Sequence, residues 1–279
     1  MKKKLLMSLL ALVLLTTMIT PVLADSKSAA VAIGADNTEE QLKTVYGFFN
    51  IKRGDVEETV VTNADERQYL EGLVSLDKIG SVALSSVYVQ EKDTGGIDLK
   101  TNNIDWVTDE MYESALVTAG ITNAKVIVAA YTPVSGTGAL TGIYKAYETA
   151  TGTTLDEAAK STAVDEVVVT GELKDAVGDD GVKIITSLKG ELAQTKNMSD
   201  DEIRQLIVDT AKKYDTVLDD QQIEEILALV NRFNELNIDP DTFIKLAQAS
   251  QGSQGFFDQF QSLFQDFGNF FSNLISGNK

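Results

Sequence analysis

The secondary-structure signal of this chain changes near residue 153, and the change restricts the folds that the chain can adopt. Between residues 30 and 150, short runs rich in β-branched side chains alternate with segments that carry helix-capping patterns. After Thr153 the strand signals nearly vanish, and amphipathic helical patterns replace them. The sequence therefore predicts an α+β protein, with a mixed α/β N-terminal domain that holds a small sheet, followed by an all-helical C-terminal region.

Five strands are predicted in the N-terminal part, and helical segments separate most of them. The turn-like residues 93–96 lie between the third and fourth strands, which predicts a hairpin at this place. The order β-α-β-α-β-β-α-β predicts a mixed sheet with helices on at least one face. The predicted strands are residues 30–34, 56–62, 81–90, 97–100 and 124–130.

Helix starts are marked by capping residues. Thr38 precedes Gln41 at capping-box spacing, and Asn63 is predicted to cap a helix whose first turn holds Glu66. Thr108 opens a helix that ends at Gly120, a residue suited to the position after a helix end. In the C-terminal part, residues 199–203 and 219–223 start two similar amphipathic helices, which predicts a helical hairpin.

The first 24 residues have the pattern of a secretory signal peptide. Lys2, Lys3 and Lys4 precede an apolar run over residues 5–15, and small residues follow before a cleavage point at Asp25. Eleven helical residues span roughly 16 Å, which is too short for a hydrocarbon core about 30 Å thick. We therefore expect a secreted, extracytoplasmic protein, and retention at the cell surface stays an open alternative to release. Its expected parts are a signal peptide (1–24), the α/β domain (25–152), the helical region (153–249) and the tail (250–279).

The composition excludes several kinds of chemistry. The chain has no Cys and no His, so it lacks a disulfide scaffold, a thiolate nucleophile, a Ser-His-Asp triad and a His-ligated metal site. Its formal net charge of −18 argues against nucleic acid as a partner, because phosphate contacts need clustered Lys and Arg. No cofactor and no metal site are predicted.

A loop of small residues is the sharpest local motif. Residues 132–142 follow the last predicted strand, and a helix is predicted to start near Gly138. One interpretation is an anion or carbonyl site built from backbone N–H groups; the other is a tight strand-to-helix turn in which Ser135 or Thr137 is the N-cap. The candidate ligand-binding residues are Ser135, Gly136, Thr137, Gly138 and Ala139.

Serine-enzyme arrangements fit the sequence poorly, and no catalytic residue is assigned. Lys145 would lie roughly 10 Å along the helix from Ser135, too far to act as its base. Carboxylate pairs are the remaining common catalytic groups, but no acid pair stands out, and a single Trp provides little stacking surface for a sugar polymer.

The C-terminal tail carries an amphipathic Phe-rich helix after a Ser-, Gln- and Gly-rich joint that we expect to be flexible. Three roles are open: packing within the protein, binding a partner or a second copy, and peripheral contact with a membrane. The polar face lacks the Lys and Arg of a typical membrane-surface helix, which places the membrane second. The candidate interaction residues are Phe256, Phe257, Phe260, Phe264, Phe267, Phe270 and Phe271.

Four segments together resemble a known family. They are residues 31–36, 103–108, 115–121 and 134–143, and the similarity is most specific over residues 115–148. The chain resembles the exported bacterial proteins grouped as domain of unknown function 1002, over roughly residues 30–245. This resemblance implies export and a shared fold, and it carries no catalytic or binding residue.

The leading functional hypothesis is a non-enzymatic, exported envelope protein that binds a ligand or partner. The 132–142 loop and the Phe-rich helix are its candidate contact surfaces. The expected partner is an envelope protein, a cell-wall component or a second copy of the chain. The alternative hypothesis is a carboxylate-dependent hydrolase that acts on cell-wall material.

Overall fold

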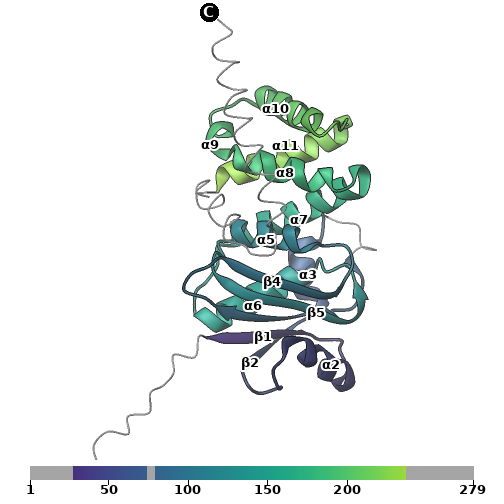
Figure 1. Ribbon diagram of the computed structural model, residues 1–279, viewed down its shortest axis with the longest axis vertical. Helices are drawn as coiled ribbons and strands as arrows, with labels where there is room; N and C mark the ends of the chain where they lie inside the picture. Colours follow the sequence, from purple (N-terminus) through teal and green to yellow (C-terminus); the bar gives the residue numbers. More distant parts are fainter. Residues whose placement is uncertain (1–27, 74–78, 237–279) are drawn as a thin grey trace, which may run out of the picture.

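A five-stranded mixed sheet forms the base of the molecule. The computed structural model describes residues 28–73 and 79–236 (Figure 1). The strands are arranged in the order β2-β1-β3-β5-β4, and only β3 runs against the other four. The prediction of a small mixed sheet in the N-terminal part is therefore confirmed. The strands are β1 (Ala29–Gly34), β2 (Glu57–Val61), β3 (Ser86–Glu91), β4 (Ile97–Ile104) and β5 (Ala124–Val134).

The predicted hairpin between the third and fourth strands is wrong, because β5 lies between β3 and β4 and pairs with both. The reason is burial: the position between β3 and β4 buries Val126 and Val128 of β5 completely. The intervening turn is held against the start of β5, where Lys92 N donates to Asn123 O and Gly96 N donates to Asn123 Oδ1. The composition of residues 93–96 does mark a turn, but a turn does not determine which strands pair.

Helices cover both faces of the sheet. Helix α2 (Glu39–Phe49) packs on one face through Leu42, Val45, Tyr46 and Phe49. On the other face lie α3 (Asn63–Leu70), α5 (Asp109–Thr118) and α6 (Ala139–Thr151), which share one apolar core with the strands. The Thr38 capping box and the Thr108 cap are confirmed. The cap of α3 is Thr62 rather than Asn63, and Asp65 completes its capping box.

The C-terminal part of the described chain is helical, as predicted. In Figure 1 the sheet occupies the lower part of the molecule, α5 and α7 lie above it, and α8 to α11 form the upper part. Capping boxes at Ser199 and Asp219 start the two helices of the predicted hairpin, α10 and α11, which pack on each other. These helices are α7 (Glu157–Val177), α8 (Asp180–Gly190), α9 (Leu192–Thr195), α10 (Asp200–Lys213) and α11 (Asp220–Glu235).

Helix α7 joins the two parts of the protein. Ala163, Val164 and Val167 belong to the core of the sheet, whereas Val169 and Leu173 belong to the core of the C-terminal helices. A single helix thus contributes to both cores, so the sheet and the helical layer are packed together along α7. The predicted signal peptide and the predicted Phe-rich helix lie outside the described residues. Within the described part of the chain, no helix has both the length and the apolar character that a membrane span requires.

Candidate functional site

The candidate site is a pocket at the edge of the sheet where the four parallel strands end. Because β1, β2, β4 and β5 run in one direction, their carboxyl ends meet at this edge. Open α/β sheets bind their ligands in the crevice outside the carboxyl ends of the strands. The pocket has a volume of about 180 Å³ and lies between residues 134–138, which follow β5, and the segment 79–85, which leads into β3. We call it the edge pocket.

The backbone of the 134–138 loop is fixed by contacts with the neighbouring elements. Gly136 has φ +90°, and a Cβ there would lie 2.5 Å from both Ile104 Cγ2 and Tyr112 Oη, so only glycine fits without a shift. The Tyr112 hydroxyl donates to Gly136 O at 2.5 Å. Val107 N donates to Ser135 O at 3.0 Å, which holds the loop beside the chain that leaves β4. The loop is therefore a preformed wall of the pocket.

The structure brings together most of the predicted loop residues. Ser135, Gly136, Thr137 and Gly138 line the edge pocket, while Ala139 is buried as the first residue of α6. The interpretation of Ser135 or Thr137 as an N-cap is wrong. Gly138 is the N-cap residue and makes no side-chain capping bond, and the two hydroxyls lie 3.3 Å from each other. The predicted strand also continues to Val134 instead of ending at residue 130.

Glu66 is the residue of this site that the sequence analysis did not single out. It comes from α3, it is 4% exposed, and it lines the edge pocket opposite the loop. Its carboxyl group lies against Gly138: a Cβ at that position would be 2.3 Å from Glu66 Oε1 and 2.4 Å from Glu66 Cδ. Glycine at position 138 therefore makes room for the carboxyl group. No local pattern signals this contact, because the two residues are far apart in the sequence.

The surroundings of Glu66 favour its protonated form. Burial raises the pKa of Glu66 to about 7. The weak hydrogen bond from Asn63 Nδ2, at 3.4 Å, lowers this pKa, whereas the negative charges of Asp36 and Asp65 raise it further. Two cations of the described residues, on α3 and α6, are engaged with other groups. Arg67 Nη2 donates to Gly80 O at 3.0 Å, and Lys145 Nζ lies 2.8 Å from Asp65 Oδ1.

No cation lies within ion-pair distance of Glu66 among residues 28–73 and 79–236. With a pKa of about 7, this carboxyl group is present in both its neutral and its charged form at neutral pH.

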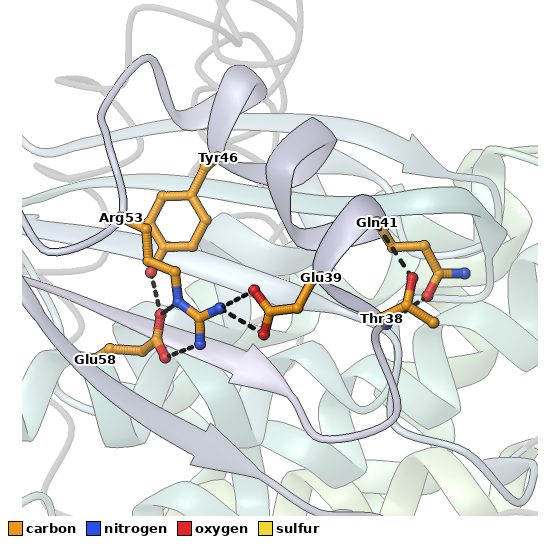
Figure 2. A network of polar contacts seen from close by, with 6 residues as sticks. All are labelled: Thr38, Glu39, Gln41, Tyr46, Arg53 and Glu58. Atoms are coloured by element: carbon orange, nitrogen blue, oxygen red, sulfur yellow. Dashed lines mark hydrogen bonds and ion pairs between the residues drawn. The ribbon is translucent and has the colours of Figure 1, made fainter.

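A second polar cluster shows a different arrangement, in which one guanidinium group binds two carboxylates (Figure 2). Arg53 donates through Nη1 to both oxygens of Glu39, and through Nε and Nη2 to the two oxygens of Glu58. The Tyr46 hydroxyl donates to Glu58 Oε2 at 2.5 Å. These bonds fasten the turn after α2 to β2. Because both carboxylates already bind Arg53 and its Nε, Nη1 and Nη2 are all used as donors, we assign this cluster a structural role.

A buried ion pair lies between the sheet layer and the helical layer. Lys189 Nζ lies 2.8 Å from Glu166 Oε1, and the two side chains are 0% and 2% exposed. Lys189 also donates to the hydroxyl of Ser114 at 3.0 Å, and Thr118 donates to Glu166. Burial lowers the pKa of Lys189, and the charge of Glu166 opposes that shift. A substrate has no access to this serine-lysine contact, because Lys189 is fully enclosed, so the cluster joins α5, α7 and α8.

The fold and the edge pocket define an α+β protein with a carboxyl-edge pocket that holds a buried carboxyl group. The model of the family described as "Protein of unknown function (DUF1002)" matches residues 33–249, so the chain belongs to this family and the resemblance seen in the sequence is confirmed. The chain is also 37% identical over 245 residues to the "Uncharacterized protein YpuA" of Bacillus subtilis (strain 168), an alignment that covers 85% of this chain and 83% of YpuA. No solved structure matches this chain.

Proposed function

We propose that this protein is an exported cell-envelope protein that binds a ligand or partner through the edge pocket and does not break bonds in it. The observation that carries the proposal is the pocket itself: a preformed hollow at the carboxyl edge of the sheet, lined by the loop 134–138. Export rests on the signal-peptide pattern of residues 1–24. The proposed ligand is a cell-wall component or a segment of an envelope protein.

The size of the pocket limits what it accepts. A volume of about 180 Å³ corresponds to about six water molecules at about 30 Å³ each. This is smaller than the roughly 300 Å³ at which pockets for whole drug-sized ligands begin. We therefore propose that the pocket holds one terminal group or one side chain of a larger ligand, while the remainder of that ligand lies on the surface.

The proposal is tested by closing the pocket. Val82 lines the pocket and is 49% exposed, so Val82→Trp narrows the entrance without disturbing the core. Val217→Trp is the matched control, since Val217 is 90% exposed in the turn between α10 and α11. Soluble cell-wall fragments should shift the amide NMR signals of residues 79–85 and 134–138 in the mature chain and in Val217→Trp, but not in Val82→Trp. Equal shifts in both variants, or no shifts at all, would contradict the proposal.

A second candidate function is favoured by one observation. A carboxyl group with a pKa of about 7 is suited to act as a general acid at neutral pH, as a carboxylate-dependent hydrolase requires. Such an enzyme also needs a second carboxylate near the bond that it breaks. Release of soluble products from purified cell walls, abolished by Glu66→Gln, would support the hydrolase and would refute a purely binding role.

Location and the role of the tail are tested together by cell fractionation. We propose that the chain is exported and that its Phe-rich tail, by self-association or by binding a partner, retains it at the cell surface. The full-length protein should then remain with the cells, whereas a version stopped at Ser250 should appear in the medium. Equal release of both versions would exclude retention by the tail, and finding both in the cytoplasm would exclude export.

A further inference from the structure

We infer that the edge pocket receives a primary ammonium group on a short aliphatic chain, with the Glu66 carboxylate as its partner. This inference rests on the proposed binding function and adds the chemical class of the group that is bound. Lysine side chains of proteins and diamino acids of wall peptides both carry this group, and the chemistry that the pocket recognises is the same in both.

The charge of the pocket favours a cation. Glu66 Oε1 has no hydrogen-bond partner among the described residues, and Oε2 has only the weak contact with Asn63. Among the described residues, the charges that shift the pKa of Glu66 belong to two acids: Asp36, which follows β1, and Asp65, which precedes Glu66 on α3. Asp65 is paired with Lys145, so a positive group in the pocket would be attracted mainly by Glu66 and Asp36, and an anion would be repelled. The anion predicted from the loop alone therefore fits this pocket less well than a cation.

The number and kind of hydrogen-bond acceptors in the pocket match an ammonium group. An ammonium group has three N–H donors. Three side-chain acceptors line the pocket: the Glu66 carboxylate and the hydroxyls of Ser135 and Thr137. A guanidinium group is favoured where both oxygens of a carboxylate are available for a bidentate contact. One oxygen of Glu66 lies near Asn63 and the other lies near Gly138, so a single point charge is the better match.

The apolar part of the pocket wall matches an aliphatic chain. Ile79, Val82, Leu84 and Val134 line the pocket together with the acceptors. Methylene groups gain free energy when such side chains remove them from water. A volume equal to about six water molecules is enough for a chain of four methylenes that ends in an ammonium group.

Proton linkage gives the inference a distinctive signature. A bound cation favours the charged form of Glu66, so binding below neutral pH must release a proton and must strengthen as pH rises from 5.5 to 8. The other groups on the neighbouring elements do not reverse this sign. Asp36 and Asp65 add negative charge, Lys145 on α6 is paired with Asp65, and Arg67 on α3 donates to Gly80 O.

The test is an NMR titration of the mature chain with two matched probes. Nα-acetyl-lysine methylamide carries the ammonium group, and Nα-acetyl-norleucine methylamide has a methyl group in its place. We expect the lysine probe to shift the amides of residues 79–85 and 134–138 together with the carboxyl carbon of Glu66. The norleucine probe should bind at least about tenfold more weakly, and the lysine probe should bind more tightly at pH 8 than at pH 5.5.

Two variants complete the test. Glu66→Gln should weaken binding of the lysine probe at least about tenfold and remove its pH dependence. Glu71→Gln makes the same charge change at an exposed position just after α3, and it should leave binding unchanged. Equal binding of both probes, or unchanged binding by Glu66→Gln, would overturn the inference. If soluble wall fragments shift the pocket amides but the lysine probe does not, the ammonium inference fails while the binding function stands; if neither shifts them, both fail.

Discussion

The buried carboxyl group of Glu66 predicts an unusual dependence of stability on pH. The pKa of this carboxyl group is higher in the folded chain than in the unfolded chain. Its contribution to the free energy of unfolding is therefore greatest at low pH, where the group is protonated in both the folded and the unfolded chain. This contribution is fully present below the ordinary pKa of 4.5 and is lost as pH rises through about 7. Glutamine keeps the shape of Glu66 and cannot ionise. In Glu66→Gln, the free energy of unfolding should therefore not show this decrease with rising pH.

The size of the effect follows from the two pKa values. Between 4.5 and about 7, each pH unit changes the free energy of unfolding by about 1.4 kcal/mol, which gives about 3 kcal/mol in total. The residue is 4% exposed, so solvent screens the effect little. About 2 to 3 kcal/mol of the total falls between pH 5 and pH 8.

The assay is urea unfolding, followed by circular dichroism, of residues 25–279 with and without Glu66→Gln at pH 5 and pH 8. Other carboxylates titrate in both proteins and cancel in the comparison. From pH 5 to pH 8, the unfolding free energy of the unmodified chain should fall by about 2 to 3 kcal/mol relative to that of Glu66→Gln. A relative change below about 0.5 kcal/mol would show that water solvates the Glu66 carboxyl group in the folded chain, and it would refute the reasoning above.

Three other predictions concern the scaffold. Lys189→Met leaves Glu166 buried without its cation and should lower the free energy of unfolding by about 3 to 5 kcal/mol. The double variant with Glu166→Leu should regain most of this free energy, and urea unfolding measures both variants. Gly171→Ala places a Cβ 2.3 Å from the ring of Trp106, so it should lower the free energy of unfolding by about 1 to 3 kcal/mol. It should also shift the fluorescence emission of this single tryptophan, and an unchanged emission would show that the ring has room for the methyl group. Thr38→Ala removes the cap of α2 and should cost about 1 kcal/mol in the same unfolding assay, while a change near zero would show that the cap contributes nothing to the folded chain.

The sequence predicted those features that depend on a few neighbouring residues. The capping boxes at Thr38, Ser199 and Asp219 are satisfied by the residue three positions later, so the pattern and its structure lie in the same short segment. The predicted cap of α3 was displaced by one residue, since Thr62 and Asp65 satisfy the same pattern as well as Asn63 and Glu66 do. Helix starts were therefore predictable to within about one residue.

The strand order and the site depended on contacts between distant residues. The position of β5 between β3 and β4 follows from competition among strands for burial, which a turn signal at residues 93–96 does not report. The glycine at 138 was recognised as part of a candidate site, but the group that occupies the adjacent space comes from α3. An unpaired acid at a helix start is common on surfaces, where the helix dipole favours it. Only the fold shows that Glu66 is enclosed.

Glu66 differs from the other buried carboxyl groups of this protein in its surroundings, and this difference supports a functional role of the edge pocket. Glu58, Glu166 and Asp165 each lie within 3.1 Å of a cation, so their charges are compensated by the chain itself. Glu191 is as buried as Glu66, but it accepts a hydrogen bond from Gln194, and the charge of Lys213 offsets part of the effect of burial on its pKa. Glu66 instead adjoins a hollow and lacks a compensating cation among the described residues, at a cost of about 3 kcal/mol above neutral pH. Local arrangements that lower stability without an internal gain are expected at functional sites, where a ligand supplies the missing interaction.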